Sequence, residues 1–242
     1  MYEGIYNMDL TSPRTIRNIQ EQFGFTFKKG LGQNFLTARN ILEEIVDAAE
    51  IESGVIEVGP GFGVLTSELA QNSDKVVTIE IDERLIDVLD YTLAEYDNVK
   101  IINEDILKLD LKKVIDDEFN GEKVSIAANL PYYITTPIIT KLLEEKLPIK
   151  NIVVMVQKEV ADRMPAKPST KDYGAITVLC QYYTEPSIVA NVPASLFVPP
   201  PKVDSAVLKL KVLDKPSVEV KDEGVFFRVV KAAFSQRRKT LL

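Results

Sequence analysis

The sequence predicts an α/β protein built on a doubly wound, mostly parallel β-sheet. Short apolar runs recur along the chain, and segments with apolar residues at helical spacing separate several of them. The runs are apolar at consecutive positions, which is typical of parallel strands that helices cover on both faces. With 242 residues and 45% apolar content, the chain can build one large domain, or one domain with part of a second.

The first expected elements are two helices. Ser12 and Pro13 predict the start of a short basic helix, and Gly24 predicts its end. A second helix is expected within 37–51. Its apolar face consists of Ile41, Leu42, Ile45, Val46 and Ala49.

The sheet itself is expected from five apolar runs, which occupy 54–59, 75–81, 99–102, 123–128 and 151–157. The clearest helical segments between these runs are 64–71, 82–96 and 136–147. Residues 174–183 fit a helix or a strand, and we favour a helix. Two further strands are expected at 186–193 and 202–213, joined by a proline-rich connection.

Composition excludes several kinds of chemistry. The chain has no histidine and only one cysteine, Cys180, so an internal disulfide, a zinc site and a histidine-based triad are excluded, and we expect no metal. No apolar run approaches the roughly 18 residues of a membrane span, and the N-terminus lacks a signal-peptide stretch. We therefore expect a soluble cytoplasmic protein with no membrane partner.

Charge is distributed unevenly along the chain. The 29 Lys and Arg against 36 Asp and Glu give a net charge of −7, which by itself argues against a nucleic-acid partner. Basic residues nevertheless gather in 27–30, 157–171 and 235–242. Two interpretations stay open, ordinary solvated charges or a local face that binds a phosphate backbone. In the second, the RNA-binding residues are Lys28, Lys29, Arg163, Lys167, Lys171, Arg237, Arg238 and Lys239.

A glycine-rich segment, EVGPGFG at 57–63, lies between the first strand of the expected sheet and the following helix. Gly59 and Gly61 permit a tight turn and a close approach of ligand to backbone, in front of a helix N-terminus. Glu80 ends the next strand, where a carboxylate can accept hydrogen bonds from ribose hydroxyls. A nucleoside cofactor site and a purely structural glycine turn are both compatible with this pattern.

Asp105 follows the third strand and can accept a hydrogen bond from an adenine amino group. This order, with glycines after the first strand and an acid after each of the next two, suits S-adenosylmethionine better than a nicotinamide dinucleotide. The second phosphate-binding half of the fold, which a dinucleotide would need, is missing from the sequence. The upstream segment GQNFL supplies Gln33, Asn34 and Leu36. It either covers the cofactor from the other side or is a plain loop.

The loop after the fourth strand, Asn129 to Tyr132, is expected to face the methyl group of such a cofactor. An adenine amino nitrogen is a poor nucleophile because its lone pair is delocalised into the ring. The Asn129 side-chain carbonyl and the Leu130 backbone carbonyl can accept its two hydrogens, so that the lone pair points at the methyl carbon. Pro131 restricts Leu130 to extended conformations, and Tyr132 offers an aromatic face for the base. No general base is needed, since positioning can contribute up to roughly 7–11 kcal/mol.

Two of these aromatic positions have a plainer interpretation. Asn129 to Tyr132 can be a turn with a buried tyrosine, although its place after Asp105 and at the end of a strand argues against this. Phe197 is either a second stacking face for an extruded base or an ordinary core phenylalanine.

Several segments together resemble, in order and spacing, the KsgA/RsmA ribosomal RNA adenine dimethyltransferases. They are GQNFL, EVGPGFGVLT, IEID, NEDIL, NLPYYITTP, VQKEVADRM, DYGAITV, FVPPPKVDSAV and FSQRRKTL, and the resemblance extends from about Phe27 to the last residue. It implies a Rossmann-like class I methyltransferase sheet, mostly parallel with an antiparallel C-terminal strand, and S-adenosylmethionine as cofactor. The implied activity is transfer of two methyl groups to N6 of each of two neighbouring adenines near the 3′ end of small-subunit (16S) rRNA, in an assembling 30S particle.

Residue by residue, the resemblance implies cofactor contacts at Asn34, Leu36, Gly59, Glu80, Asp105 and Asn129, with Asn129 and Tyr132 at the target base. Tyr133 is a departure, because many relatives have asparagine there. The intact Asn129 to Tyr132 means that this departure affects a loop contact rather than the chemistry.

Three other functions remain as alternatives. An Erm-type enzyme methylates large-subunit rRNA with the same loop, but FVPPPKVDSAV and QKEVADRM look more like the small-subunit group. A ribosome-assembly binding factor with a vestigial site is disfavoured by the intact Glu80 and Asn129. A DNA adenine methyltransferase usually carries an acid where this chain has Asn129.

The expected domain organisation is a methyltransferase domain over 1–213, in which 1–36 forms the N-terminal helix and the cofactor-covering loop. Residues 214–242 are expected to be a linker and the start of a helical C-terminal domain. The helix beginning at Val225 is expected to lack partners for its apolar face. We expect a monomer.

Overall fold

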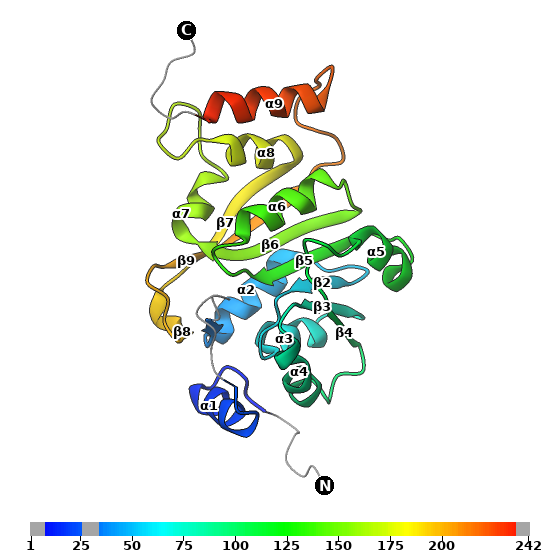
Figure 1. The fold of residues 1–242 in the computed structure, drawn as a ribbon, viewed down its shortest axis with the longest axis vertical. Coiled ribbons are helices and arrows are strands. Elements are labelled where there is room, and N and C mark those ends of the chain that lie inside the picture. The colour runs from blue at the N-terminus through cyan, green and yellow to red at the C-terminus, as the bar shows by residue number, and fades with distance from the viewer. Residues whose placement is uncertain (1–7, 26–33, 236–242) are drawn as a thin grey trace.

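The structure, a computed structural model, describes residues 8–25 and 34–235. Among these residues a seven-stranded sheet forms the centre of the fold, in the order β4-β3-β2-β5-β6-β9-β7 (Figure 1). Its strands are β2 (Val55–Val58), β3 (Val76–Glu80), β4 (Val99–Asn103), β5 (Val124–Asn129), β6 (Ile149–Gln157), β7 (Thr184–Val192) and β9 (Ser205–Val212). All the predicted strands are therefore present.

The first five strands of this sheet, β2 to β6, pair in parallel, and β9 is antiparallel to both β6 and β7. The predicted mostly parallel α/β class is confirmed. The register pairs Val58 with Ile79 and with Ala128, so β2, β3 and β5 end at the same edge of the sheet. We call this the carboxyl edge.

Helices cover both faces of the sheet. One face packs against α2 (Arg39–Ala49), α3 (Val64–Gln71) and α4 (Ile86–Thr92), and α1 (Pro13–Gln22) adds Ile16 and Ile19 to the same apolar core. The other packs against α5 (Leu111–Phe119), α6 (Thr135–Glu144) and α8 (Ala175–Tyr183). Side chains alternate between the faces of a strand, so Val55 belongs to the first core and Ile56 to the second.

The helix predicted at 82–96 is shorter in the structure. A 3₁₀ turn, η2 (Glu83–Leu85), precedes α4, because the Asp82 carboxylate accepts the Arg84 N–H and caps the turn. Helix α4 ends at Thr92. Residues 174–183 form a helix, as favoured, and the predicted apolar face of α2 is buried throughout.

Helix α9 (Glu223–Phe234) lies beside α8, at the end of the molecule opposite α1 (Figure 1). Tyr182 contacts Phe226 and Phe227 with ring centroids 5.3 and 5.2 Å apart, and both Tyr182 and Tyr183 donate hydrogen bonds to Glu223 at 3.3 Å. The expectation that this helix lacks partners was wrong in part: α8 supplies partners for Phe226 and Phe227, whereas Val225 and Val229 are exposed. The division into domains at residue 213 stays a prediction.

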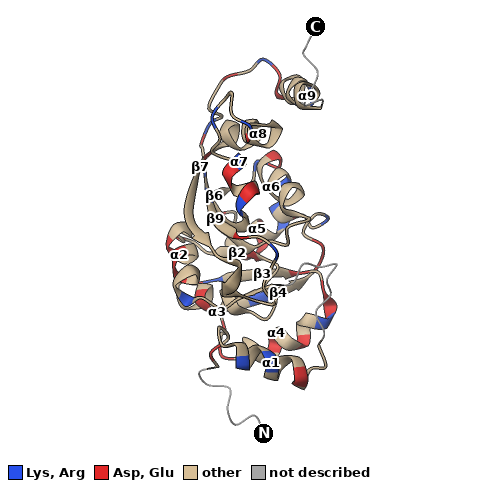
Figure 2. Ribbon diagram, turned by 90° about the vertical axis from the view of Figure 1, so that its left-hand side faces the viewer, with Lys and Arg blue, Asp and Glu red and all other residues tan. Residues whose placement is uncertain are grey.

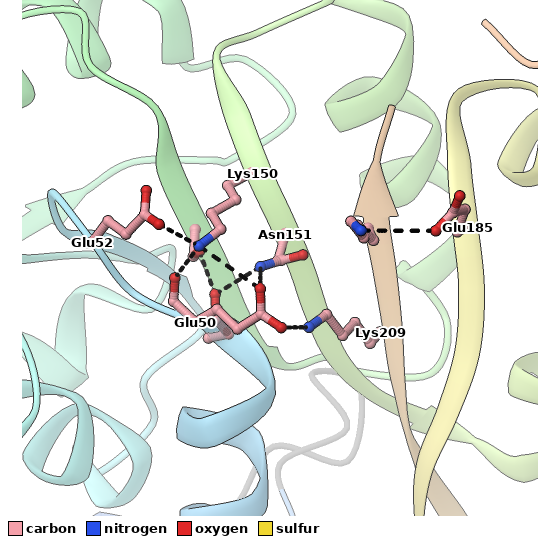
Figure 3. A network of polar contacts seen from close by, with 9 residues as sticks. Glu50, Glu52, Lys150, Asn151, Glu185 and Lys209 are labelled. Atoms are coloured by element: carbon pink, nitrogen blue, oxygen red, sulfur yellow. Dashed lines mark hydrogen bonds and ion pairs between the residues drawn. The ribbon is translucent and has the colours of Figure 1, made fainter. Parts of the chain in front are cut away.

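The opposite, amino edge of the sheet is joined to α2 by a polar network (Figure 3). The carbonyl of Ala49 accepts hydrogen bonds from Ser125 Oγ at 2.6 Å and Asn151 Nδ2 at 3.0 Å. Glu50, in a left-handed conformation just after the helix, binds Lys209 at 2.5 Å, and Lys150 donates to the Glu50 carbonyl at 3.1 Å. The C-terminal end of α2 is thereby fixed to β5, β6 and β9.

No helix within 8–25 and 34–235 is long and apolar enough to cross a membrane.

Candidate active site

A cavity opens at the carboxyl edge of the sheet, where β2, β3, β4 and β5 end. It encloses about 1170 Å³, including solvent space at its mouth. The structure brings nearly every predicted cofactor and catalytic residue to its wall, namely Asn34, Leu36, Gly59, Gly61, Glu80, Asp105, Asn129, Leu130, Pro131, Tyr132 and Phe197. Gln33 lies outside the described residues.

The turn after β2 depends on glycine. Gly59 and Gly61 have φ angles of +72° and +60°, a region that L side chains rarely adopt. A Cβ at Gly61 would also lie 2.7 Å from the Phe35 ring, whereas a Cβ at Gly59 would meet open space. The turn therefore presents bare backbone to the cavity at Gly59 and lets Phe35 pack closely at Gly61.

Glu80 is the buried carboxylate at the end of β3, with 5% of its surface exposed. Its Oε1 accepts a hydrogen bond from the Asp82 N–H at 2.8 Å. Burial raises the pKa of Glu80 to about 6, although backbone hydrogen bonds from Asp82, Gly61 and Ile81 lower it. A buried acceptor at the cavity wall is suited to binding ligand hydroxyls.

Asp105 follows β4 in a tight turn. Its Oδ1 accepts the Leu107 N–H at 3.0 Å, and Lys108 Nζ lies 3.8 Å from Oδ2. Two isoleucines also line the cavity, Ile81 after β3 and Ile106 directly after Asp105. Apolar walls with one carboxylate can hold a flat base and accept a bond from its amino group.

Sequence reasoning missed Glu57, in the middle of β2. It is 1% exposed, lines the cavity, and its Oε2 accepts a 2.6 Å hydrogen bond from Thr66 of α3. Burial raises the pKa of Glu57 to about 7, which outweighs the hydrogen bond from Thr66. The available signal was a carboxylate inside an otherwise apolar strand, a position that ordinarily requires a partner.

The amide of Asn129, the last residue of β5, is oriented by the chain segment that precedes α2. Its Nδ2 donates to the backbone carbonyl of Asn34 at 3.1 Å. The amide group has a second polar atom, Oδ1, and the side chain lines the cavity. With the amino end directed at Asn34, the oxygen is the atom left to accept a hydrogen bond from a ligand.

Leu130, Pro131 and Tyr132 continue from Asn129 in a fixed backbone path. The Leu130 N–H binds the Met155 carbonyl at 3.1 Å, and the Ile134 N–H binds the Pro131 carbonyl at 3.1 Å. The Tyr132 hydroxyl is hydrogen-bonded to Ser205 Oγ at 2.8 Å. Burial raises the pKa of Tyr132, so its phenol stays neutral near pH 7.

Phe197 is 3% exposed and lines the same cavity. It belongs to the two-residue strand β8 (Phe197–Val198), which pairs antiparallel with β1 (Phe35–Leu36), and Leu36 lies opposite Phe197. Thr37 adds two hydrogen bonds to the Leu196 carbonyl, from its N–H at 2.9 Å and its hydroxyl at 2.8 Å. Sequence reasoning did not predict this pairing, which joins two distant segments of the chain in the cavity wall.

The predicted RNA-binding residues are only partly described. Arg163 ends α7 (Lys158–Arg163), which starts at the carboxyl edge directly after β6, and it pairs with Glu159 one turn earlier. Lys167 and Lys171 are exposed in the loop that follows. Acidic and basic positions are intermixed along α6 and α7 (Figure 2). Lys28, Lys29, Arg237, Arg238 and Lys239 lie outside the described residues.

These features fit a nucleoside cofactor with a transferable group. The open glycine turn, the buried Glu80 and the apolar walls beside Asp105 follow three successive parallel strands, and an oriented amide follows the next strand along the chain. The fold and the site together define a Rossmann-like class I methyltransferase, whose cofactor is S-adenosylmethionine.

Comparison with known proteins identifies the family. Residues 24–242 match the family described as ribosomal RNA adenine dimethylase. The chain is 56% identical over 237 residues to a ribosomal RNA small subunit methyltransferase A from Bacillus mycoides, covering 97% of this chain and 81% of that protein. The chain belongs to the ribosomal RNA adenine dimethylase family, as its sequence motifs predicted.

Two solved structures are also similar. A dimethyladenosine transferase from Plasmodium falciparum is 33% identical with a TM-score of 0.69, covering 86% of this chain and 73% of that one. The 23S rRNA methyltransferase ErmE is 31% identical with a TM-score of 0.68, covering 85% of this chain and 81% of that one. The fold alone therefore does not separate a dimethyladenosine transferase from a 23S rRNA methyltransferase, whereas the 56% sequence identity favours the small-subunit group.

Proposed function

We propose that this protein dimethylates N6 of two adjacent adenines near the 3′ end of small-subunit rRNA, using S-adenosylmethionine. We further propose that it acts as a monomer in the cytoplasm, on an assembling 30S particle. The observation that carries the proposal is the hydrogen bond from Asn129 Nδ2 to the Asn34 carbonyl, which leaves Asn129 Oδ1 to accept an amino hydrogen of adenine.

The protein acts in this mechanism by orienting the nucleophile. When bound, S-adenosylmethionine supplies an electrophilic methyl group on a sulfonium. Asn129 Oδ1 and the Leu130 carbonyl accept the two N6 hydrogens, so that the N6 lone pair is directed at the methyl carbon. Transfer of that methyl group to N6 would leave S-adenosylhomocysteine, and the extra proton on N6 would pass to water.

The neighbouring groups support this geometry. Tyr132, held by Ser205 at 2.8 Å, provides a stacking face for the base, and its neutral phenol is not a base near pH 7. Glu80 is proposed to bind the ribose hydroxyls and Asp105 the adenine amino group of the cofactor. Phe197, buried in the wall, is proposed as a second apolar surface against the target base.

The second methyl transfer requires a smaller set of contacts. Once N6 carries one methyl group, it has one hydrogen left, so one of the two acceptors must suffice for orientation. We therefore expect the second transfer to depend on stacking and on the fixed loop more than the first does.

RNA affinity is proposed to come from phosphate contacts by the basic residues around the carboxyl edge, including Arg163, Lys167 and Lys171. Neutralising one phosphate-binding side chain should reduce the slope of log affinity against log salt by about 0.7–0.9. Structured RNA is recognised mainly by shape and phosphate contacts, so a small subunit should be a better substrate than a short free oligonucleotide.

The decisive experiment is labelled methyl transfer to isolated small subunits, large subunits and duplex DNA, followed by nucleoside analysis. We expect N6,N6-dimethyladenosine in small-subunit rRNA, and labelling that is slower by about 100-fold or more with Asn129→Ala. Label in large subunits alone would favour the alternative represented by the 23S enzyme. Only monomethyladenosine after exhaustive turnover would contradict dimethylation.

A further inference from the structure

Large apolar side chains are exposed in an uneven pattern. Of the nine large apolar side chains that are exposed among the described residues, four lie in loops at the carboxyl edge: Ile81 at 54%, Leu107 at 37%, Tyr133 at 58% and Val203 at 45%. They follow β3, β4 and β5 or precede β9, and two of them, Ile81 and Tyr133, also line the cavity. Exposed apolar groups gathered at a cavity mouth indicate a contact surface.

Tyr133 differs sharply from the tyrosine beside it. Tyr132 is half-buried and bound to Ser205, whereas Tyr133 is the most exposed residue of this group and lines the same cavity. The backbone around both is fixed by the Leu130 and Ile134 N–H bonds. The Tyr133 ring is therefore held at the mouth by a rigid loop, with most of its surface in water.

The loop before β9 is attached to the same place. The Tyr132 hydroxyl is hydrogen-bonded to Ser205. The backbone carbonyl of Asp204 accepts the Lys158 N–H at 3.0 Å, and its carboxylate accepts the Ala194 N–H at 2.9 Å. These bonds fix a loop on which Lys202 is exposed next to Val203. An exposed aromatic ring that lines the cavity and an exposed cation thus lie on two connected loops at the carboxyl edge.

An extruded target base creates a need for such a surface. Because the base leaves its stack to enter the cavity, the next base along the strand loses a stacking partner and exposes one face. An exposed aromatic ring can replace that partner, and such stacking tolerates any sequence. A nearby ammonium group can contact the phosphate that joins the two nucleotides.

We propose that Tyr133 and Lys202 form a subsite for the nucleotide adjacent to the target adenine, in which the Tyr133 ring stacks on its base and the Lys202 ammonium contacts its phosphate. The subsite rests on the proposed RNA methyl transfer. It is distinct from the cofactor and catalytic residues, so its loss should weaken RNA binding without changing cofactor affinity.

The test is steady-state methylation of small subunits by Tyr133→Ala, Tyr133→Leu and Tyr133→Phe. Stacking on an exposed ring falls at the weak end of base–aromatic stacking, so KM should rise about 5- to 20-fold for Ala and Leu. Phe keeps the ring and should stay within about twofold of wild type, and kcat should change less than about twofold in all three. Val218→Ala, at a 52% exposed residue in the connection to α9, is the control and should leave KM unchanged.

A binding measurement makes the test independent of turnover. Fluorescence anisotropy with a short single-stranded oligoadenylate, in the presence of S-adenosylhomocysteine, should show the same order of variants. Lys202→Gln should reduce the salt slope by about 0.7. Calorimetry should give wild-type affinity for S-adenosylhomocysteine in every variant.

Several outcomes would overturn the subsite. A wild-type KM and oligoadenylate affinity in Tyr133→Ala would remove the ring from RNA binding, and full retention by Tyr133→Leu would indicate a general apolar contact, such as one with a protein, instead of stacking. A fall in kcat alone would assign Tyr133 to loop geometry. Inactivity of the wild-type enzyme on small subunits would instead count against the proposed function, while the oligoadenylate comparison would still decide the subsite.

Discussion

The raised pKa of Glu80 predicts a pH-dependent cofactor affinity. A carboxylate that accepts bonds from ribose hydroxyls must be ionised, and burial raises the pKa of Glu80 to about 6 in the free protein. Below that pH, cofactor binding therefore has to remove a proton from the Glu80 carboxyl group. At pH 5 only about one molecule in eleven is ionised, so affinity should fall about elevenfold relative to pH 8, or about 1.4 kcal/mol.

The perturbation is Glu80→Gln, measured by calorimetry with S-adenosylhomocysteine at pH 5 and pH 8. The variant lacks the titrating group, so it should bind more weakly at pH 8 by roughly 1–3 kcal/mol, and the elevenfold difference should disappear. The ligand's own groups titrate equally with both proteins, so the ratio of wild-type to variant affinity isolates Glu80. Glu185→Gln, at an exposed carboxylate of β7 outside the cavity lining, serves as the control and should keep the pH dependence.

Two results would refute this reasoning. Equal wild-type affinity at both pH values would mean that Glu80 does not have to ionise on binding. A Glu80→Gln variant with the full wild-type pH dependence would assign the titration to another group.

Two further predictions concern the catalytic loop and the buried strand carboxylate. Asn129→Ala and Asn129→Asp should each lower kcat by about 100-fold or more, while cofactor binding is largely retained. The Asp variant tests the orientation, because Asp keeps an acceptor but cannot donate to the Asn34 carbonyl. An Asp variant near wild-type turnover would exclude the orienting role of that bond. Glu57 has a pKa of about 7 in the folded protein against 4.5 ordinarily. Its contribution to the free energy of unfolding is therefore fully present below pH 4.5 and is lost as pH rises through 7. The loss is on the order of 3 kcal/mol. Urea unfolding from pH 4.5 to 8 should therefore show Glu57→Gln gaining stability relative to wild type as pH rises, and parallel curves for the two proteins would contradict the raised pKa.

Local sequence pattern was sufficient for most of the fold. The helical spacing of Ile41, Leu42, Ile45, Val46 and Ala49 predicted the buried face of α2, and the short apolar runs predicted β2 to β6. Because parallel strands end at one edge, the same pattern also placed Gly59, Glu80, Asp105 and Asn129 around one cavity. Both predictions depend on hydrophobic periodicity and on the order of strands and helices, which can be derived from a single sequence.

Contacts between distant segments were not predictable in the same way. The bond from Asn129 to the Asn34 carbonyl joins residues 95 positions apart, and the two-residue pair of β1 and β8 has no periodicity to detect. The partners of α9 were missed because the aromatic side chains of α8 could equally have faced solvent or the sheet. Glu57 was interpreted only as part of a ligand motif, since only the fold shows that Thr66 lies against it.

The network at the amino edge has a consequence for how the molecule opens locally. Buried hydrogen bonds from Ser125 and Asn151 hold the Ala49 carbonyl, whereas the start of α2 is preceded by the short β1 pairing at Phe35 and Leu36. The side chains of Phe35, Leu36 and Phe197 are buried, but the β1–β8 pair is two residues long and has few backbone bonds, so we expect local openings to begin there and to leave the far end of α2 intact. Amide protons around the entrance would then exchange with solvent without global unfolding. On this expectation, the segment that orients Asn129 would open locally while the sheet stays folded.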